Sequence, residues 1–358
     1  MPTGLLMRST GSRYTVRGED GVLHSCIAKG KLRTKGYTST NPLAVGDVVD
    51  FEPAAETVGN ELVGAITHLH DRRNYLVRKS VNLSHRKHVI ASNMDQCLVL
   101  VTVARPWTSF GFIDRVLVTA EAYQIPPVII FNKVDDLNHD EQALLAEYEA
   151  VYQGVGYRTL RTSALKGIGI DEVKALLRGK VSLLVGHSGV GKSTLVNAID
   201  PALDLDTWEV SASTDKGQHT TTTAQMFEVG MDSEEFVGRS SEEGRDDSGS
   251  HALRLTSFAL RTTNHEPRPT PYAPTFLIDT PGVKGFGLVD MKQDEIVDQF
   301  PEFFARKGEC RFGNCTHLRE PGCAVLKAVE EGAIAASRYR SYVDMVEGVE
   351  EDDTYRAG

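Results

Sequence analysis

A glycine-rich loop suited to binding phosphate occupies residues 186–194, with the sequence GHSGVGKST. It follows an apolar run at 181–185 and precedes the apolar start of a helix at 195–199. The spacing G-x-x-x-x-G-K-[ST] between a strand and a helix lets backbone N–H groups surround phosphate oxygens. The Lys192 ammonium is then expected to reach the β- and γ-phosphates of a nucleotide, and the Ser193 hydroxyl to bind Mg²⁺. The predicted nucleotide-binding residues of this loop are Gly186, His187, Ser188, Gly189, Val190, Gly191, Lys192, Ser193 and Thr194.

Two further motifs have the chemistry to recognise guanine. The sequence N-K-V-D at 132–135 follows an apolar run at 127–131, and S-A-L at 163–165 follows a shorter run at 157–160. The Asp135 carboxylate can accept both N1–H and the exocyclic amino group of guanine, which adenine does not offer. Asn132 can meet the other base edge, Lys133 the base plane, and the backbone at 163–165 the guanine O6. The residues predicted to contact the base are Asn132, Lys133, Val134, Asp135, Ser163, Ala164 and Leu165.

A third group of residues is suited to the γ-phosphate, Mg²⁺ and the attacking water. Asp279 follows an apolar run at 275–278 and begins the sequence D-T-P-G, so it is expected to hold Mg²⁺, with Gly282 N–H toward the γ-phosphate. Thr221, in the sequence GQHTTTT at 217–223, is the expected switch threonine, with Thr220 as the alternative. Residue 283 is valine and cannot orient water, so His219 is the candidate for that role. For residues 279–282 the alternative is a plain turn with no role in nucleotide binding. For His219 the alternative is an exposed loop histidine with no role in catalysis. The predicted catalytic residues are His219 and Lys192, and the predicted magnesium ligands are Ser193, Thr221 and Asp279.

Four potential metal ligands lie close together near the C-terminus, at Cys310, Cys315, His317 and Cys323. Three thiols and one imidazole form a standard tetrahedral set for structural zinc, with no open position for catalysis. The chain has five cysteines in all, an odd number that does not favour a disulfide framework. The segments at 296–306 and 324–347 on either side of the cluster are expected to be helical.

The candidate site residues follow short apolar runs, so their positions depend on a sheet. From about residue 95, these runs alternate with stretches of helical period, for example at 113–123 and 140–152. Buried strands separated by helices are typical of a parallel α/β sheet, and ligands bind at the edge where its strands end. Residues 1 to about 85 instead show short β-type runs with turn residues between them, which predicts a small barrel, with an OB-like barrel as one candidate.

The order of the motifs is unusual. In Ras-like GTPases the phosphate loop and D-x-x-G precede N-K-x-D and S-A, whereas here N-K-V-D and S-A-L come first. Because the termini of a compact domain are often adjacent, a circular permutation can preserve the site. The chain is then expected to leave the sheet just after 279–282 and to enter the cysteine-rich segment.

Charge is distributed unevenly along the chain. The net charge is −10, yet residues 1–90 carry 13 Lys/Arg against 8 Asp/Glu, a net of +5, which leaves −15 for the remainder. This asymmetry favours a basic module that contacts a polyanion, with ordinary surface variation as the alternative. Acidic residues gather at 232–250 and 350–358, and 265–274 is proline-rich, so none of these segments is expected to be regularly folded. Neither a signal peptide nor an apolar run of about 20 residues is present, so we expect a cytoplasmic protein without membrane contact.

The whole set of motifs, in this order, resembles the ribosome small subunit-dependent GTPase A family (RsgA, also called YjeQ). The resemblance implies an OB-like RNA-binding barrel, here at 1–88, and a circularly permuted α/β P-loop GTPase domain, here at 89–290 with a flexible insert at 232–274. It also implies a helical zinc domain at 291–349, before an acidic tail at 350–358. The family's catalytic histidine maps onto His219.

The resemblance further implies hydrolysis of GTP to GDP, stimulated by the small ribosomal subunit and its rRNA during late maturation. We expect one structural Zn²⁺ per chain, Mg²⁺ with GTP, and a monomer. The acidic segment 232–250 lengthens a connection that is usually compact, and we expect it to point away from rRNA or to gate binding. A P-loop kinase or ATPase, and an RNA-binding scaffold that uses GTP only structurally, remain the alternatives.

Overall fold

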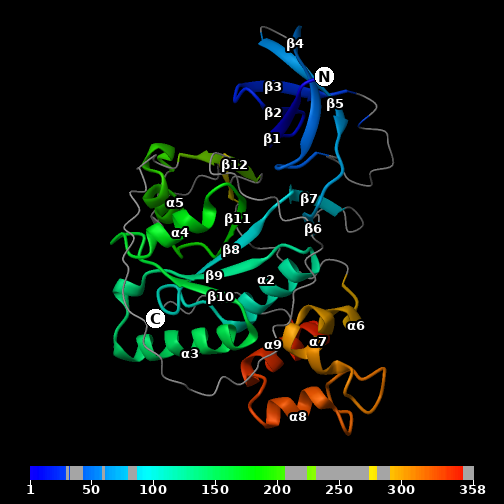
Figure 1. The fold of residues 1–358 in the computed structure, drawn as a ribbon, viewed down its shortest axis with the longest axis vertical. Helices are drawn as coiled ribbons and strands as arrows, with labels where there is room; N and C mark the ends of the chain where they lie inside the picture. Colours follow the sequence, from blue (N-terminus) through cyan, green and yellow to red (C-terminus); the bar gives the residue numbers. More distant parts are fainter. Residues whose placement is uncertain are drawn as a thin grey trace, which may run out of the picture.

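The computed structural model describes residues 1–29, 32, 43–58, 61–79, 87–205, 224–230, 274–279 and 291–349. Within them a barrel, a central sheet flanked by helices, and a C-terminal group of helices follow one another along the long axis of the molecule (Figure 1). The predictions for His219, Thr221 and Gly282 lie outside the described residues, as do those for the acidic segments 232–250 and 350–358 and for all but the last residue of the proline-rich segment 265–274.

Five strands form the N-terminal barrel: β1 (Thr3–Thr10), β2 (Arg13–Gly18), β3 (Leu23–Ala28), β4 (Val48–Val58) and β5 (Glu61–Leu69). Their order is β1-β2-β3-β5-β4, and β4 returns to pair with β1, so the barrel is closed. Only β3 and β5 run parallel among these pairs. Leu6, Val16 and Phe51 are among the apolar side chains buried inside. This five-stranded closed order confirms the prediction of an OB-like barrel.

A hairpin of β6 (Tyr75–Lys79) and β7 (Lys87–Ser92) connects the barrel to the rest of the chain. The fully buried Asp47 carboxylate accepts hydrogen bonds from Arg72 Nε at 2.7 Å and Ser92 Oγ at 2.6 Å, which fixes the hairpin to the barrel. The expected domain boundary after residue 88 falls inside β7. The division of the chain at 88, 290 and 349 stays a prediction.

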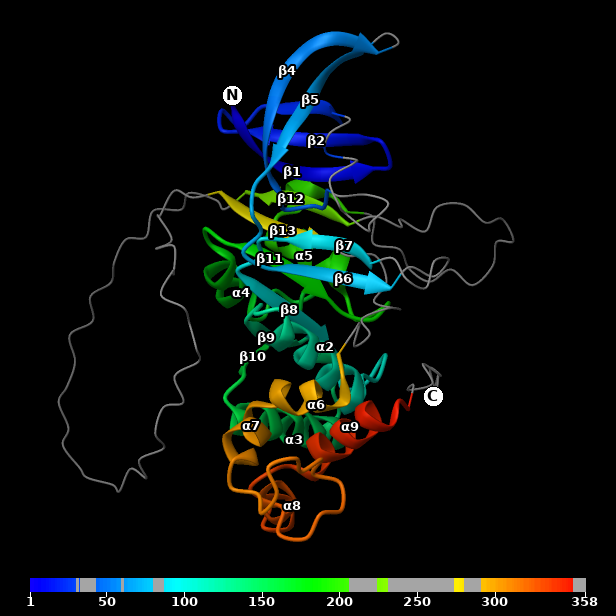
Figure 2. The same ribbon diagram turned by 90° about the vertical axis from the view of Figure 1, so that its right-hand side faces the viewer.

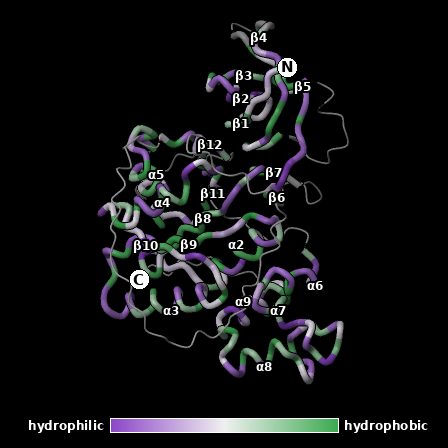
Figure 3. Tube along the Cα trace, viewed as in Figure 1, coloured by the Kyte–Doolittle hydropathy of each residue, from purple (hydrophilic) through white to green (hydrophobic). Residues whose placement is uncertain are grey.

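The central sheet has the strand order β10-β9-β8-β11-β13-β12. Its strands are β8 (Gln96–Val101), β9 (Pro127–Phe131), β10 (Arg158–Arg161), β11 (Val181–Val185), β12 (Gln225–Val229) and β13 (Thr275–Asp279). All neighbours are parallel except β12 and β13. Apart from β10, which has the sequence RTLR, these strands are rich in hydrophobic residues (Figure 3), and every residue of β8 is buried.

Four helices cover the two faces of this sheet. One face packs against α2 (Phe110–Ala122) and α3 (His139–Val155), and the other against α4 (Ile170–Leu177) and α5 (Lys192–Ile199). Alternate residues of each strand therefore face different helices, as in β8, where Val99 and Leu100 belong to the two separate cores. The predicted α/β sheet, with strands buried on both faces, is confirmed.

The C-terminal part consists of α6 (Gln293–Ile296), the 3-10 turn η3 (Val297–Gln299), α7 (Pro301–Lys307), α8 (Ala324–Glu330) and α9 (Ala336–Glu347). The segments 296–306 and 324–347, expected to be helical, are largely helical, but each is divided by a break. Pro301 has no N–H to continue a helix, so it begins α7 instead. Gly332 takes a left-handed φ of 73°, and the amides of Gly332 and Ala333 bond back to Val329 and Ala328, which ends the helix before α9 begins.

A buried ion cluster fixes these helices to the central part. Arg338 of α9 is fully buried and donates to Asp114 of α2 at 2.6 Å and to Glu302 of α7 at 2.7 Å. Its guanidinium carbon lies 4.6 Å from the centre of the Phe300 ring, which adds a cation–π contact. Among the helices described, none is long and apolar enough to cross a membrane. Figure 2 shows the C-terminal helices at the end of the molecule opposite the barrel.

Candidate nucleotide site and metal cluster

The predicted nucleotide motifs meet at one edge of the central sheet. In the parallel register Leu184 pairs with Asp279, Val185 with Val99, and Phe131 with both Val101 and Arg161. All five parallel strands therefore end together, and the segments that begin at Gly186, Asn132 and Thr162 leave from the same edge as Asp279. Motifs in permuted order are thus brought to one place by strand register.

The glycines of the phosphate loop allow close backbone packing. A Cβ at Gly186 would lie 2.4 Å from the Leu100 carbonyl oxygen, and one at Gly191 would lie 2.6 Å from Asn132 Nδ2. Gly191 also takes a left-handed φ of 97° as it begins α5, a conformation that L side chains rarely adopt. The loop consequently depends on glycine at both positions to turn tightly beside the guanine motif.

Asn132 connects three of the predicted motifs. It is buried, and its Nδ2 donates to the Val190 carbonyl at 2.8 Å. Its Oδ1 accepts from Thr162 Oγ1 at 3.0 Å and from the Ala164 N–H at 3.2 Å. Since an amide nitrogen carries two protons, Nδ2 can still donate a second bond to a base. The Ala164 N–H, by contrast, already donates to Asn132, so a guanine O6 would share or replace that bond.

Lys192 is held inside the phosphate loop at the start of α5. Its Nζ donates to the carbonyl oxygens of Gly186 at 2.7 Å and His187 at 2.8 Å. Burial lowers the pKa of this ammonium, while the negative charge of Asp279 raises it. Lys192 and Asp279 therefore act on each other electrostatically, as expected of a phosphate-binding lysine beside a magnesium-binding carboxylate.

The guanine motif presents its carboxylate to solvent. Asp135 lies in the short 3-10 turn η1 (Val134–Asp136) and is exposed. Lys133 takes a left-handed φ of 62°, and its Nζ donates to the Arg105 carbonyl at 2.7 Å. Burial lowers the pKa of Lys133. Leu165, also predicted to lie at the base, is 78% exposed.

One neighbour of the phosphate loop was missed by the sequence analysis. Phe112 of α2 packs against the His187 ring, with 3.5 Å between the ring centres. Two residues further along the same helix, Asp114 binds Arg338 of the C-terminal helices. Helix α2 therefore touches the phosphate loop and the C-terminal part together, a contact for which the sequence gives no local pattern.

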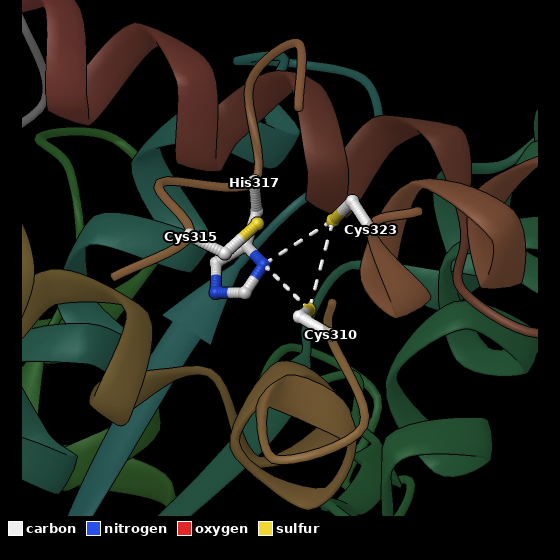
Figure 4. A group of neighbouring side chains, drawn as sticks. All are labelled: Cys310, Cys315, His317 and Cys323. Carbon is white, nitrogen blue, oxygen red and sulfur yellow. Dashed lines mark hydrogen bonds between the residues drawn. The ribbon is translucent and has the colours of Figure 1, made fainter. Parts of the chain in front are cut away.

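The four predicted metal ligands converge between α7, α8 and α9 (Figure 4). His317 Nδ1 lies 3.5 Å from Cys310 Sγ and 3.3 Å from Cys323 Sγ, and these two sulfurs are 3.9 Å apart. A tetrahedron with Zn–S bonds of about 2.3 Å and a Zn–N bond of about 2.0 Å has ligand–ligand edges of roughly 3.5–3.8 Å. With Cys315, all four ligand atoms lie within 4.8 Å of one another. The Cys₃His cluster therefore fits a tetrahedral metal ion.

The surrounding backbone supports the Cys₃His cluster. The N–H groups of Ala324 and Leu326 donate to the sulfurs of Cys310 at 3.3 Å and Cys323 at 3.4 Å, which favours thiolates. From α9, the Tyr342 hydroxyl donates to the Thr316 carbonyl at 2.7 Å, which fixes the loop that carries His317. Ligands and supporting groups thus come from one small helical unit.

Comparisons with known proteins agree with this geometry. The family model described as RsgA GTPase matches residues 69–234, and that of the RsgA N-terminal domain matches residues 3–60. Proteins named small ribosomal subunit biogenesis GTPase RsgA, from Flavobacterium psychrophilum and Christiangramia forsetii, are 45% and 46% identical to this chain. The alignments cover 99% of this chain in both cases, and 94% and 98% of the relatives. The chain belongs to the RsgA GTPase family.

Two solved structures share the fold. YjeQ from Thermotoga maritima aligns with a TM-score of 0.69 at 30% identity, over 97% of this chain and 98% of that one. YloQ, described as a circularly permuted GTPase, aligns with a TM-score of 0.64 at 23% identity, over 98% and 95% of the two chains. As a member of the RsgA family the chain is a GTP hydrolase. The multidomain fold with a circularly permuted GTPase core, predicted from motif order, is confirmed.

Proposed function

We propose that this RsgA family member binds the small ribosomal subunit and hydrolyses GTP during late maturation of that subunit, which in turn stimulates turnover. The observation that carries the proposal is the identity of 45% and 46%, over 99% of the chain, to proteins named small ribosomal subunit biogenesis GTPase RsgA. The partner is the subunit with its rRNA, and the chain works as a monomer in the cytoplasm.

The residues at the sheet edge have distinct roles in this proposal. Lys192 neutralises the β- and γ-phosphates, and Asp135 selects guanine. Ser193, Thr221 and Asp279 hold Mg²⁺, whose charge supports the developing negative charge on the transferred phosphoryl group. Gly282 N–H meets the γ-phosphate, and His219 positions the attacking water. The ordered strand ends and the glycine-dependent phosphate loop support these assignments.

Zinc is the metal we assign to the Cys₃His cluster. The ligand set of three thiolates and one imidazole, and ligand spacings that match a tetrahedron, favour Zn²⁺ over harder cations. Because all four positions are taken by protein atoms, this metal stabilises the C-terminal helices and takes no part in hydrolysis.

The barrel is the module we assign to rRNA. OB folds commonly bind nucleic acid, and the net charge of +5 in residues 1–90 comes from residues 71–90, which follow the barrel strands and include most of the β6–β7 hairpin. Phosphate contacts of this kind weaken steeply as salt concentration rises. Cosedimentation with purified small subunits, compared with large subunits and repeated at several salt concentrations, tests the assignment. Equal binding to both subunits, or binding that salt leaves unchanged, would contradict it.

Release from the subunit is expected to depend on the nucleotide. If hydrolysis relaxes the segments that meet the γ-phosphate, the GTP-bound and GDP-bound states should differ in affinity for the subunit. We expect tighter cosedimentation with a non-hydrolysable GTP analogue than with GDP. Equal affinity in both states would rule out this coupling.

Membership of the RsgA family disfavours the kinase, ATPase and scaffold alternatives.

A further inference from the structure

The barrel meets the central sheet at β12, which pairs with the strand β13 that ends at Asp279. Arg8 of β1 pairs with Gln225 of β12, so barrel and central sheet join into a single 11-stranded sheet. In Figure 2, β1 lies directly beside β12. β12 in turn pairs along its length with β13, where Gln225 lies opposite Asp279.

Arg17 of the barrel contacts both of these strands. Its Nε and Nη2 donate to the two carboxylate oxygens of Glu228 on β12, at 2.7 and 2.8 Å, in a bidentate pair. Its guanidinium carbon lies 5.6 Å from the centre of the Phe276 ring on β13. The Arg17 side chain is 18% exposed and that of Glu228 is 43% exposed, so the pair lies at the surface of the joint between barrel and sheet.

Both strands lead directly to residues of the proposed hydrolytic site. β12 begins six residues after His219 in the sequence, and β13 ends at Asp279. In the sequence, β12 and β13 are thus the strands nearest to His219 and Asp279, respectively. A hollow of about 460 Å³, lined in part by Arg8, Arg17 and Phe227, lies at the same joint.

We propose that Arg17 and Glu228 are positioning residues, which transmit binding of the barrel on its partner to the hydrolytic residues through β12 and β13. The inference rests on the proposed function, because it requires that subunit binding accelerates hydrolysis. It assigns the acceleration to a defined ion pair between two parts of the molecule, rather than to contact of the partner with the nucleotide site alone.

Charge reversal tests this pair. Arg17→Glu or Glu228→Arg brings two like charges together, and we expect each to lower subunit-stimulated kcat by at least about fivefold with KM for GTP unchanged. The double variant Arg17→Glu/Glu228→Arg restores the pair in reverse and should recover kcat to within about twofold. Lys29→Glu is the matched control. It changes the charge of the barrel by the same amount as Arg17→Glu, and Lys29 pairs within the barrel, with Glu52 at 2.5 Å.

The outcomes separate this inference from the proposed function. Three results would each overturn the role of the pair. They are a stimulated kcat in the single variants equal to that of wild type, no recovery of kcat in the double variant, and an equal loss of kcat in Lys29→Glu. If wild-type turnover does not respond to small subunits, the proposed function fails, and the role of the pair fails with it. The wild-type titration therefore distinguishes a failure of the proposed function from a failure of the pair alone.

Discussion

The buried Arg338 cluster predicts a large loss of stability when its one cation is removed. In Arg338→Met the side chain keeps similar bulk, but the carboxylates of Asp114 and Glu302 lose a partner that binds them at 2.6 and 2.7 Å. Arg338 and Asp114 are both fully buried, so water does not replace the lost bonds. Breaking a buried ion pair by removing one partner costs about 3–5 kcal/mol. We therefore expect the unfolding free energy to fall by about that amount.

Equilibrium urea unfolding of the full chain measures this loss. Arg340→Met is the control, because Arg340 lies on the same helix but is exposed, and its replacement should cost no more than about 0.5 kcal/mol. The triple variant Asp114→Asn/Glu302→Gln/Arg338→Met removes all three charges and should recover most of the loss. Arg338→Met within about 1 kcal/mol of wild type would show that the cluster does not hold α9 to α2.

The unfolding free energy of Arg338→Met, compared with that of wild type, should depend on pH. Burial raises the pKa of Asp114 and the charge of Arg338 lowers it, so removing Arg338 raises this pKa further in the folded state. A folded-state pKa above the unfolded value of about 3.9 means that the folded chain binds the proton more tightly. The stabilisation from protonation is complete below the unfolded pKa and is lost as pH rises through the folded pKa. Unfolding midpoints of Arg338→Met should consequently rise relative to wild type as pH falls from 8 toward 5.

Three further predictions concern the nucleotide site and the thiols. Asn132→Ala leaves the Thr162 hydroxyl and two backbone groups without their buried partner. It should therefore lower the unfolding free energy by about 2–4 kcal/mol and abolish measurable GTP binding. A variant with wild-type stability and a wild-type Kd for GTP would contradict the connecting role of Asn132. Asp135→Asn should shift preference from guanine toward xanthine nucleotides in competition assays, and an unchanged preference would exclude Asp135 as the base-selecting group. Burial raises the pKa of Cys97 to about 12 and that of Cys26 to about 11, so neither should react with a thiol reagent at pH 8 in the folded chain. Chelation should release only the three thiols of the Cys₃His cluster, and five reactive thiols without unfolding would refute this.

Local sequence patterns predicted the parts of the site that are local in the chain. The runs at 127–131 and 181–185 became β9 and β11, and the Cys₃His ligands, which lie within fourteen residues, converge as expected. Proline and glycine are residue types that interrupt helices, as Pro301 and Gly332 do here. The prediction used helical periodicity alone and so did not place these breaks.

Contacts between distant segments could not be predicted in this way. Arg17 and Glu228 are 211 residues apart, and Asp114 and Arg338 are 224 apart. A single sequence shows that these side chains are charged, but partner choice depends on how the barrel and the C-terminal helices pack on the central sheet. The motif order predicts that the chain passes directly from 279–282 into the C-terminal unit. The structure adds a connection through α2, where Phe112 contacts His187 of the phosphate loop and Asp114 accepts a hydrogen bond from Arg338 of α9.

The decisive measurement is GTP turnover titrated with purified small ribosomal subunits, in wild type and in His219→Ala. We expect wild-type turnover to rise to a plateau with subunit concentration. The His219→Ala variant should bind GTP and subunits normally but lose about 100-fold or more of the stimulated rate, as expected when a water-positioning group is removed. Turnover that does not respond to subunits, or equal stimulation of wild type and His219→Ala, would contradict a subunit-activated GTPase that uses this histidine.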